Sequence, residues 1–139
     1  MKKSILIICS SLFLLTSCKK DTTGAEINLT YQMIAEKVWY LDYSQTTTSA
    51  GTTTKTYLGQ STYFVKFLKN LSTVDSDGLN GSFIVEKANG ILQIHVKAKT
   101  VGSNTLEYIY NIETVGANNM ILYYLSAGST IKFYYNTSH

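Results

Sequence analysis

The sequence predicts an all-β fold, an antiparallel up-and-down barrel of eight strands. From residue 38 onward the strand-favouring residues Tyr, Thr, Val, Ile and Phe dominate, and the chain contains no proline. Turn residues recur at short, regular spacing and divide this region into about eight runs. Short links join consecutive runs, which favours a meander over crossing connections and suits a barrel of this length.

Turn signals separate the expected strands, and the strongest is Asn89-Gly90 between two alternating runs. A type I′ hairpin turn needs positive φ at both central residues, which this pair tolerates. The longest link is the threonine-rich stretch Gln45–Thr56, which either extends the first hairpin as a threonine ladder or lies as a flap over the barrel mouth. A short helix over 29–37 precedes the first strand. The expected strands are 38–46, 61–69, 71–75, 80–87, 91–99, 105–114, 119–126 and 130–137.

Alternation predicts which side chains face the interior. In 91–99, 105–114 and 130–137 apolar and polar positions alternate, whereas 61–69 and 119–126 are apolar on both faces and are not oriented by the pattern. One polar face per strand fits an antiparallel sheet and rules against a parallel α/β sheet. The side chains expected inside the barrel are Trp39, Leu41, Val65, Phe67, Leu92, Ile94, Val96, Leu106, Tyr108, Tyr110, Ile131, Phe133 and Tyr135.

The N-terminal segment has the pattern of a secretory signal. Lys2 and Lys3 form a positive start. The apolar run that follows is about 11 residues long, where a membrane-spanning helix needs roughly 20. At its end, Leu15-Thr16-Ser17-Cys18 resembles the lipobox of bacterial lipoproteins. The resemblance implies cleavage before Cys18 and attachment of lipid, palmitate included, to its thiol.

This reading divides the chain into a signal peptide over 1–17, a polar lipid-anchored tether over 18–28 and a barrel domain over 29–139. The residue after the cysteine is Lys19 and not aspartate, the usual inner-membrane retention signal. We therefore expect an outer-membrane protein, lipid-anchored and facing either the periplasm or the cell surface. We expect it to be a monomer.

Composition narrows the function classes further. Cys9 leaves with the signal and Cys18 carries lipid, so the mature domain has no disulfide and depends on its own core. All 12 basic residues are lysines, and removal of Lys2 and Lys3 leaves 10 against 9 acids. With no arginine and no basic cluster, nucleic-acid binding is not expected.

Several short segments resemble a known family over the whole mature chain. They are Lys37-Val38-Trp39-Tyr40-Leu41 before the long loop, Tyr63–Phe67 after it, Asp77–Phe83, Asn89-Gly90-Ile91-Leu92 and Ile121–Tyr124. Together they resemble the lipocalin-like lipoproteins of the Bacteroidota. The resemblance implies a carrier of a small apolar or amphipathic ligand, with Trp39 closing the barrel floor. This chain has Lys37 where that family has glycine, and no arginine to stack on the tryptophan.

No residue constellation predicts catalysis. His95 lies on a polar strand face and His139 is far from it in sequence, so neither a nucleophile–base pair nor a zinc site is indicated. Asp75-Ser76-Asp77-Gly78 lacks the glutamate of a calcium loop and has the pattern of a plain turn. No carboxylate falls on an apolar face that the pattern orients. We expect no enzyme activity, no metal and no cofactor.

Two functions from different classes remain open. In the first, the inward side chains line a lumen that holds one small ligand. In the second, the same bulky side chains fill the barrel. Outward tyrosines, one each from Tyr123-Tyr124 and Tyr134-Tyr135, then contact a partner such as a glycan. The many rings of the inward set favour a filled core, and the family resemblance favours the carrier.

Overall fold

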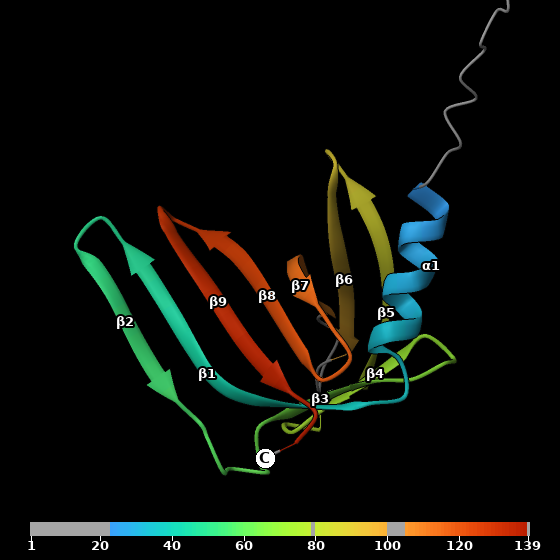
Figure 1. Cartoon of the computed structure of the whole chain (residues 1–139), viewed down its shortest axis with the longest axis horizontal. Helices are drawn as coiled ribbons and strands as arrows, with labels where there is room; N and C mark the ends of the chain where they lie inside the picture. The colour runs from blue at the N-terminus through green and yellow to red at the C-terminus, as the bar shows by residue number, and fades with distance from the viewer. Residues whose placement is uncertain (1–22, 79, 100–104, 139) are drawn as a thin grey trace, which may run out of the picture.

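The computed structural model describes residues 23–78, 80–99 and 105–138, which form one helix and a single antiparallel sheet (Figure 1). The helix α1 spans Thr23–Ile34. The strands are β1 (Val38–Thr48), β2 (Gly51–Thr56), β3 (Phe64–Phe67), β4 (Ser72–Asp75), β5 (Asn80–Ala88), β6 (Ile91–Lys99), β7 (Thr105–Val115), β8 (Asn119–Ser126) and β9 (Ser129–Asn136).

The sheet closes on itself and confirms the predicted barrel. From β3 to β9 each strand pairs with the next one along the chain, and β9 returns to pair with β1, which also pairs with β3. The closed ring therefore contains eight strands in up-and-down order. The ninth strand, β2, pairs only with β1 and lies outside the ring.

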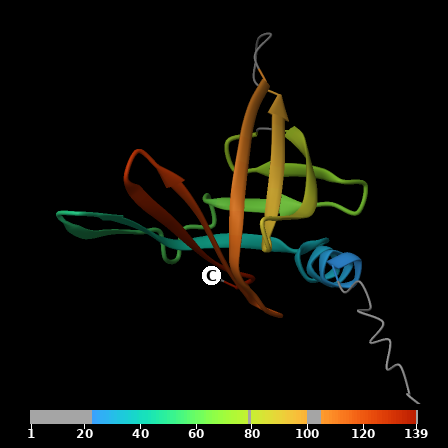
Figure 2. The same ribbon diagram turned by 90° about the horizontal axis from the view of Figure 1, so that it is seen from above.

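Strand β1 belongs both to the barrel and to a projecting hairpin. Its first residues, Val38–Tyr40, pair with β3, whereas Tyr43–Thr48 pair with β2. A bulge between Leu41 and Tyr43 marks the change. The hairpin projects from the barrel on the side away from α1 (Figures 1 and 2). The threonine-rich stretch thus extends the first hairpin and does not form a flap, and the Oγ1 atoms of Thr47 and Thr52 lie 3.0 Å apart across it.

Helix α1 begins earlier than the predicted range of 29–37 and includes part of the predicted tether. The pair Thr23 and Glu26 has the spacing of a capping box, and the predicted helix range did not include this signal. The helix ends before Glu36, whose φ of 61° leaves the helical region. Within the described residues, no helix has the length and apolarity needed to cross a membrane.

The core fills the end of the barrel that α1 covers. It is formed by seven buried side chains, namely Ile34, Trp39, Phe67, Phe83, Ile94, Met120 and Leu122. The indole of Trp39 is fully buried, and its Nε1 donates a hydrogen bond to the Ile34 carbonyl at 2.9 Å. On the other side the Lys37 ammonium lies 5.3 Å from the ring centre, a cation–π contact. Trp39 therefore joins the helix end to the barrel wall.

Two hairpin turns have the geometry of type I′ turns. Asn89 and Gly90 have φ values of 51° and 81°, as the sequence predicts. Ala127 and Gly128 have φ values of 44° and 81° in the turn between β8 and β9. Alanine is a poor residue for this conformation, because its Cβ approaches the following carbonyl oxygen.

We expect Ala127→Asn to stabilise the protein by about 0.5–1 kcal/mol, because asparagine tolerates the left-handed conformation better than alanine. Thermal unfolding followed by circular dichroism measures the change. Ala50→Asn at the tip of the β1–β2 hairpin is the matched control, since Ala50 is exposed and has no positive φ. An equal gain in both variants would contradict the explanation.

Candidate functional site

A cavity of about 290 Å³ lies inside the barrel next to the core. Its wall comes from seven of the eight barrel strands and from the turn after β4. Several of the side chains predicted to face inward line it, namely Leu41, Val65, Phe67, Val96, Tyr108, Tyr110 and Tyr135. The alternation pattern therefore identifies much of the wall.

The rest of the predicted inward set lies elsewhere. Trp39 and Ile94 are fully buried in the solid core and do not line the cavity. Leu92 shares the inward face with Ile94 but borders an open groove near α1, and Phe133 borders a second hollow, both described below. Of the two that remain, Leu106 is 41 % exposed, and Ile131 is half-buried.

Asp75 lines the cavity, on a strand whose faces the sequence pattern did not orient. Strand β4 pairs Asp75 with Val65 and Thr73 with Phe67, so its inward positions are polar. The strand has only four residues, which is too short for its alternation to be read. The Asp75 carboxylate also accepts a hydrogen bond from the Asp77 backbone N–H at 3.0 Å, so the predicted turn is present as well.

Two cavity phenols are held in their neutral form. Burial raises the pKa of Tyr110 to about 12, and the charges of Tyr108, Tyr124 and Asp75 add to the shift. Burial raises the pKa of Tyr135 as well, with Tyr110 and Asp75 contributing. Both hydroxyls therefore remain protonated near neutral pH. They can offer a ligand one hydrogen-bond donor each on an otherwise apolar wall.

The protein should lose stability as the pH rises from about 10 to about 12. A tyrosine in the unfolded chain releases its proton near pH 10, whereas folded Tyr110 keeps it until about pH 12. The folded state then binds more protons, so the free energy of unfolding falls with pH. Urea unfolding of Tyr110→Phe should show a shallower decline than the wild type. Tyr123→Phe, on the outer face of β8, is the control, and equal slopes in all three proteins would contradict the assignment.

A second hollow, here called the aromatic hollow, opens where β7 and β8 diverge. Strand β7 pairs with β6 over residues 105–111 but with β8 only from residue 111 onward. The unpaired halves leave a space of about 320 Å³. Its lining is dominated by the rings of Tyr108, Tyr110, Tyr124 and Phe133. Tyr108 and Tyr110 also line the cavity, so the two spaces are neighbours.

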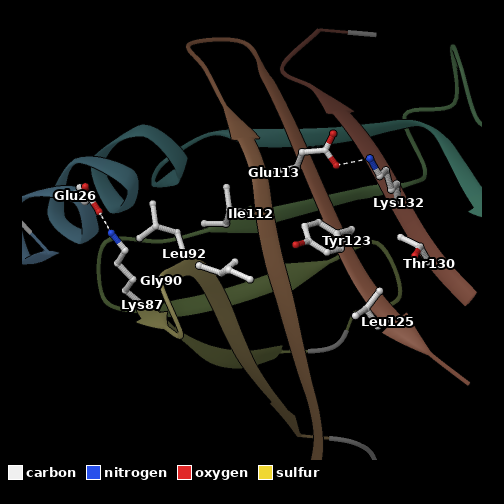
Figure 3. Close-up of a pocket in the computed structure, with 11 residues that line it drawn as sticks. Glu26, Lys87, Gly90, Leu92, Ile112, Glu113, Tyr123, Leu125, Thr130 and Lys132 are labelled. Atoms are coloured by element: carbon white, nitrogen blue, oxygen red, sulfur yellow. Dashed lines mark hydrogen bonds and ion pairs between the residues drawn. The ribbon is translucent and has the colours of Figure 1, made fainter. Parts of the chain in front are cut away.

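A third hollow, of about 690 Å³, is an open groove lined by residues of α1 and of strands β5 to β9 (Figure 3). The ion pairs Glu26–Lys87 and Glu113–Lys132, each 2.5 Å long, lie toward its two ends. Apolar side chains, among them Ile112, lie between them (Figure 3). Each pair cancels its own charge, so the groove has no net charge with which to select a ligand.

His95 lies on the outer face of β6, as predicted, and contacts two carboxylates. Its Nε2 bonds Glu107, and its Nδ1 lies 3.5 Å from Glu86. In the described part of the chain, no three histidine, cysteine or acidic side chains are placed so that they could hold a metal ion. His95 therefore belongs to a surface network of opposite charges.

The adjacent tyrosine pairs divide between the two faces, as expected from their alternation. Tyr124 and Tyr135 line the inner hollows, and their neighbours lie on the outer face. There Tyr134 stacks on Tyr43 with ring centres 4.1 Å apart and donates a hydrogen bond to Gln45. Each of these two outer rings covers a face of the other, which leaves less aromatic surface for a partner.

Comparison of the chain with protein-family models, curated proteins and solved structures finds no match. The function therefore has to be inferred from the barrel and its hollows. Of these three hollows, the cavity and the aromatic hollow combine mainly apolar, aromatic linings with a few polar groups, which is typical of small-molecule sites.

Proposed function

We propose that this chain is a lipid-anchored envelope protein of the lipocalin-like type whose barrel binds one small apolar or amphipathic ligand. The main support is the cavity of about 290 Å³ inside the barrel. This volume equals that of about ten water molecules in the liquid, at ~30 Å³ each. It lies near the lower end of the usual range for ligand pockets, so the ligand or its bound part is small.

The barrel interior has a filled end, here called the floor, and an open part that contains the cavity. The core around Trp39 fills the end covered by α1. Beside it, Phe67 and Leu122 belong both to the core and to the cavity wall. A rigid floor of this kind keeps the pocket formed before the ligand arrives, which lowers the entropic cost of binding.

The polar groups of the cavity favour an amphipathic ligand. Apolar walls suit a hydrocarbon part, while the Tyr110 and Tyr135 hydroxyls and the Asp75 carboxylate suit a polar end. Binding, and not catalysis, is proposed because the described lining includes Ser76 but no histidine or cysteine that could act with it.

The membrane attachment in this proposal comes from the sequence. Cys18 lies outside the described residues, and its role follows from the lipobox-like residues before it and from Lys19 after it. Acylation at Cys18 would attach the barrel to the outer membrane without using its apolar side chains. Those side chains would then be free for the core and the ligand.

Fluorescence titration with N-phenyl-1-naphthylamine, a neutral apolar probe, tests the binding function. The 19–139 chain is suitable because it keeps every described helix and strand. We expect saturable binding of one probe. Val65→Phe should weaken it markedly, because the larger ring narrows the cavity.

Val74→Phe is the matched control for this titration. Val74 lies on the neighbouring strand β4, but its cross-strand partners are Lys66 and Asn80, and it does not line the cavity. This variant should bind the probe like the wild type. Absence of saturable binding to the folded wild-type protein would refute the proposed function.

A further inference from the structure

The rings of the aromatic hollow line one space and contact one another. The ring centre of Tyr110 lies 6.0 Å from those of Tyr124 and Phe133, at steep interplanar angles of 69° and 86°. Tyr124 and Phe133 lie 5.9 Å apart, and Tyr108 stacks 6.1 Å from Tyr110. An aromatic face has negative electrostatic potential and attracts a cation within about 6 Å of the ring centre.

The charges around the two inner spaces have a single sign. Among the described residues that line the cavity and the aromatic hollow, the ionised groups are Asp75, Asp77 and Glu107, and no lysine contributes. Glu107 is paired with His95 and Lys97 on the outer face. Asp75 acts on the inside, because its negative charge helps to raise the pKa of Tyr110 and of Tyr135.

Aromatic ring faces and acidic side chains together favour a positively charged ligand over a neutral or negatively charged one. Acidic groups repel an anionic ligand, and a neutral polar group gains little from ring faces. A methylated ammonium group is attracted by both the acidic groups and the ring faces. It also loses less hydration energy than a primary ammonium group when it leaves water. Four rings with no lysine among the lining residues resemble the arrangement that recognises quaternary ammonium groups.

We propose that the aromatic hollow binds an alkylammonium group, so that the ligand is a cationic amphiphile with its apolar part in the neighbouring cavity. The inference rests on the proposed function, since it names the class of ligand that the same barrel holds. Tyr108 and Tyr110 border both spaces and place the charged and apolar parts of one ligand side by side.

Three ligands with the same decyl chain test the charge preference. Decyltrimethylammonium, decyldimethylamine oxide and decyl sulfate differ mainly in the charge of the head group. Each is titrated calorimetrically into the 19–139 chain below its micellar concentration. We expect the cation to bind about tenfold more tightly than the amine oxide, as cation–π contacts in a partly desolvated site allow. We expect the sulfate to bind most weakly.

Two variants locate the preference in the aromatic hollow. Tyr124→Leu and Phe133→Leu should each reduce the ratio between cation and amine oxide to about threefold or less, because each removes one ring. Tyr123→Leu is the control, since it removes a tyrosine from the outer face of β8, the strand that contains Tyr124. All three should keep the far-ultraviolet circular dichroism spectrum of the wild type, which shows that they fold, and either of the two test variants is sufficient if the other does not fold.

The outcomes separate the inference from the proposed function. Equal affinity of the wild type for all three decyl ligands would overturn the alkylammonium site while the carrier function stands. An unchanged ratio in Tyr124→Leu and Phe133→Leu would also overturn it. If neither the decyl ligands nor N-phenyl-1-naphthylamine bind the wild type, both the alkylammonium site and the carrier function are refuted.

Discussion

Trp39→Ala is expected to destabilise the barrel by about 3–5 kcal/mol. The indole is fully buried where α1 meets the barrel, so its removal leaves a cavity that the surrounding side chains cannot close. The Ile34 carbonyl also loses its bond to the indole N–H. Natural domains are stable by only about 5–15 kcal/mol, so this variant should lose a large part of the total.

Urea unfolding followed by far-ultraviolet circular dichroism measures this loss, because Trp39 is the chain's only tryptophan and its fluorescence disappears with it. Trp39→Phe is the control that retains an aromatic ring but no N–H donor. It should lose less stability than Trp39→Ala, and its residual loss reflects both the missing hydrogen bond and the smaller ring. A loss below about 1 kcal/mol in Trp39→Ala would show that this contact is not central to stability.

Cys18→Ala is expected to abolish lipid attachment to the protein completely, because the Cys18 thiol is the group to which lipid would be attached. Cells grown with radioactive palmitate should label the wild-type protein and not the variant. The protein should also leave the membrane fraction or accumulate with its signal uncleaved. Cys9→Ala is the matched control, since Cys9 lies within the predicted signal, and this variant should label normally. Labelling of Cys18→Ala would disprove the anchor.

Alternation was sufficient to predict the fold because it is a local property. Strands such as β6, β7 and β9 have one apolar and one polar face, and their side chains repeat every two residues. The turn at Asn89-Gly90 was predicted for the same reason, since the φ requirement concerns only those two residues. The start of α1 was missed because its signal, Thr23 with Glu26, lies in a segment with few apolar residues.

The site was predicted only in part because it depends on distances between strands. Alternation shows that Ile94 and Val96 face inward, but only the structure shows that Ile94 is in the solid core and Val96 on the cavity wall. Tyr124 lies in a run that is apolar on both faces, so its direction was not predictable. The inward position of Asp75 follows from the register between β3 and β4, which the sequence of a four-residue strand does not reveal.

The early start of α1 sets the height of the barrel above the bilayer if Cys18 carries lipid. Thr23 follows Cys18 by five residues, which even fully extended reach at most ~18 Å. The first residue of α1 would therefore remain within that distance of the head groups, with α1 on the membrane-proximal side of the barrel. The β1–β2 hairpin, on the side away from α1, would then extend farthest from that attachment point (Figures 1 and 2).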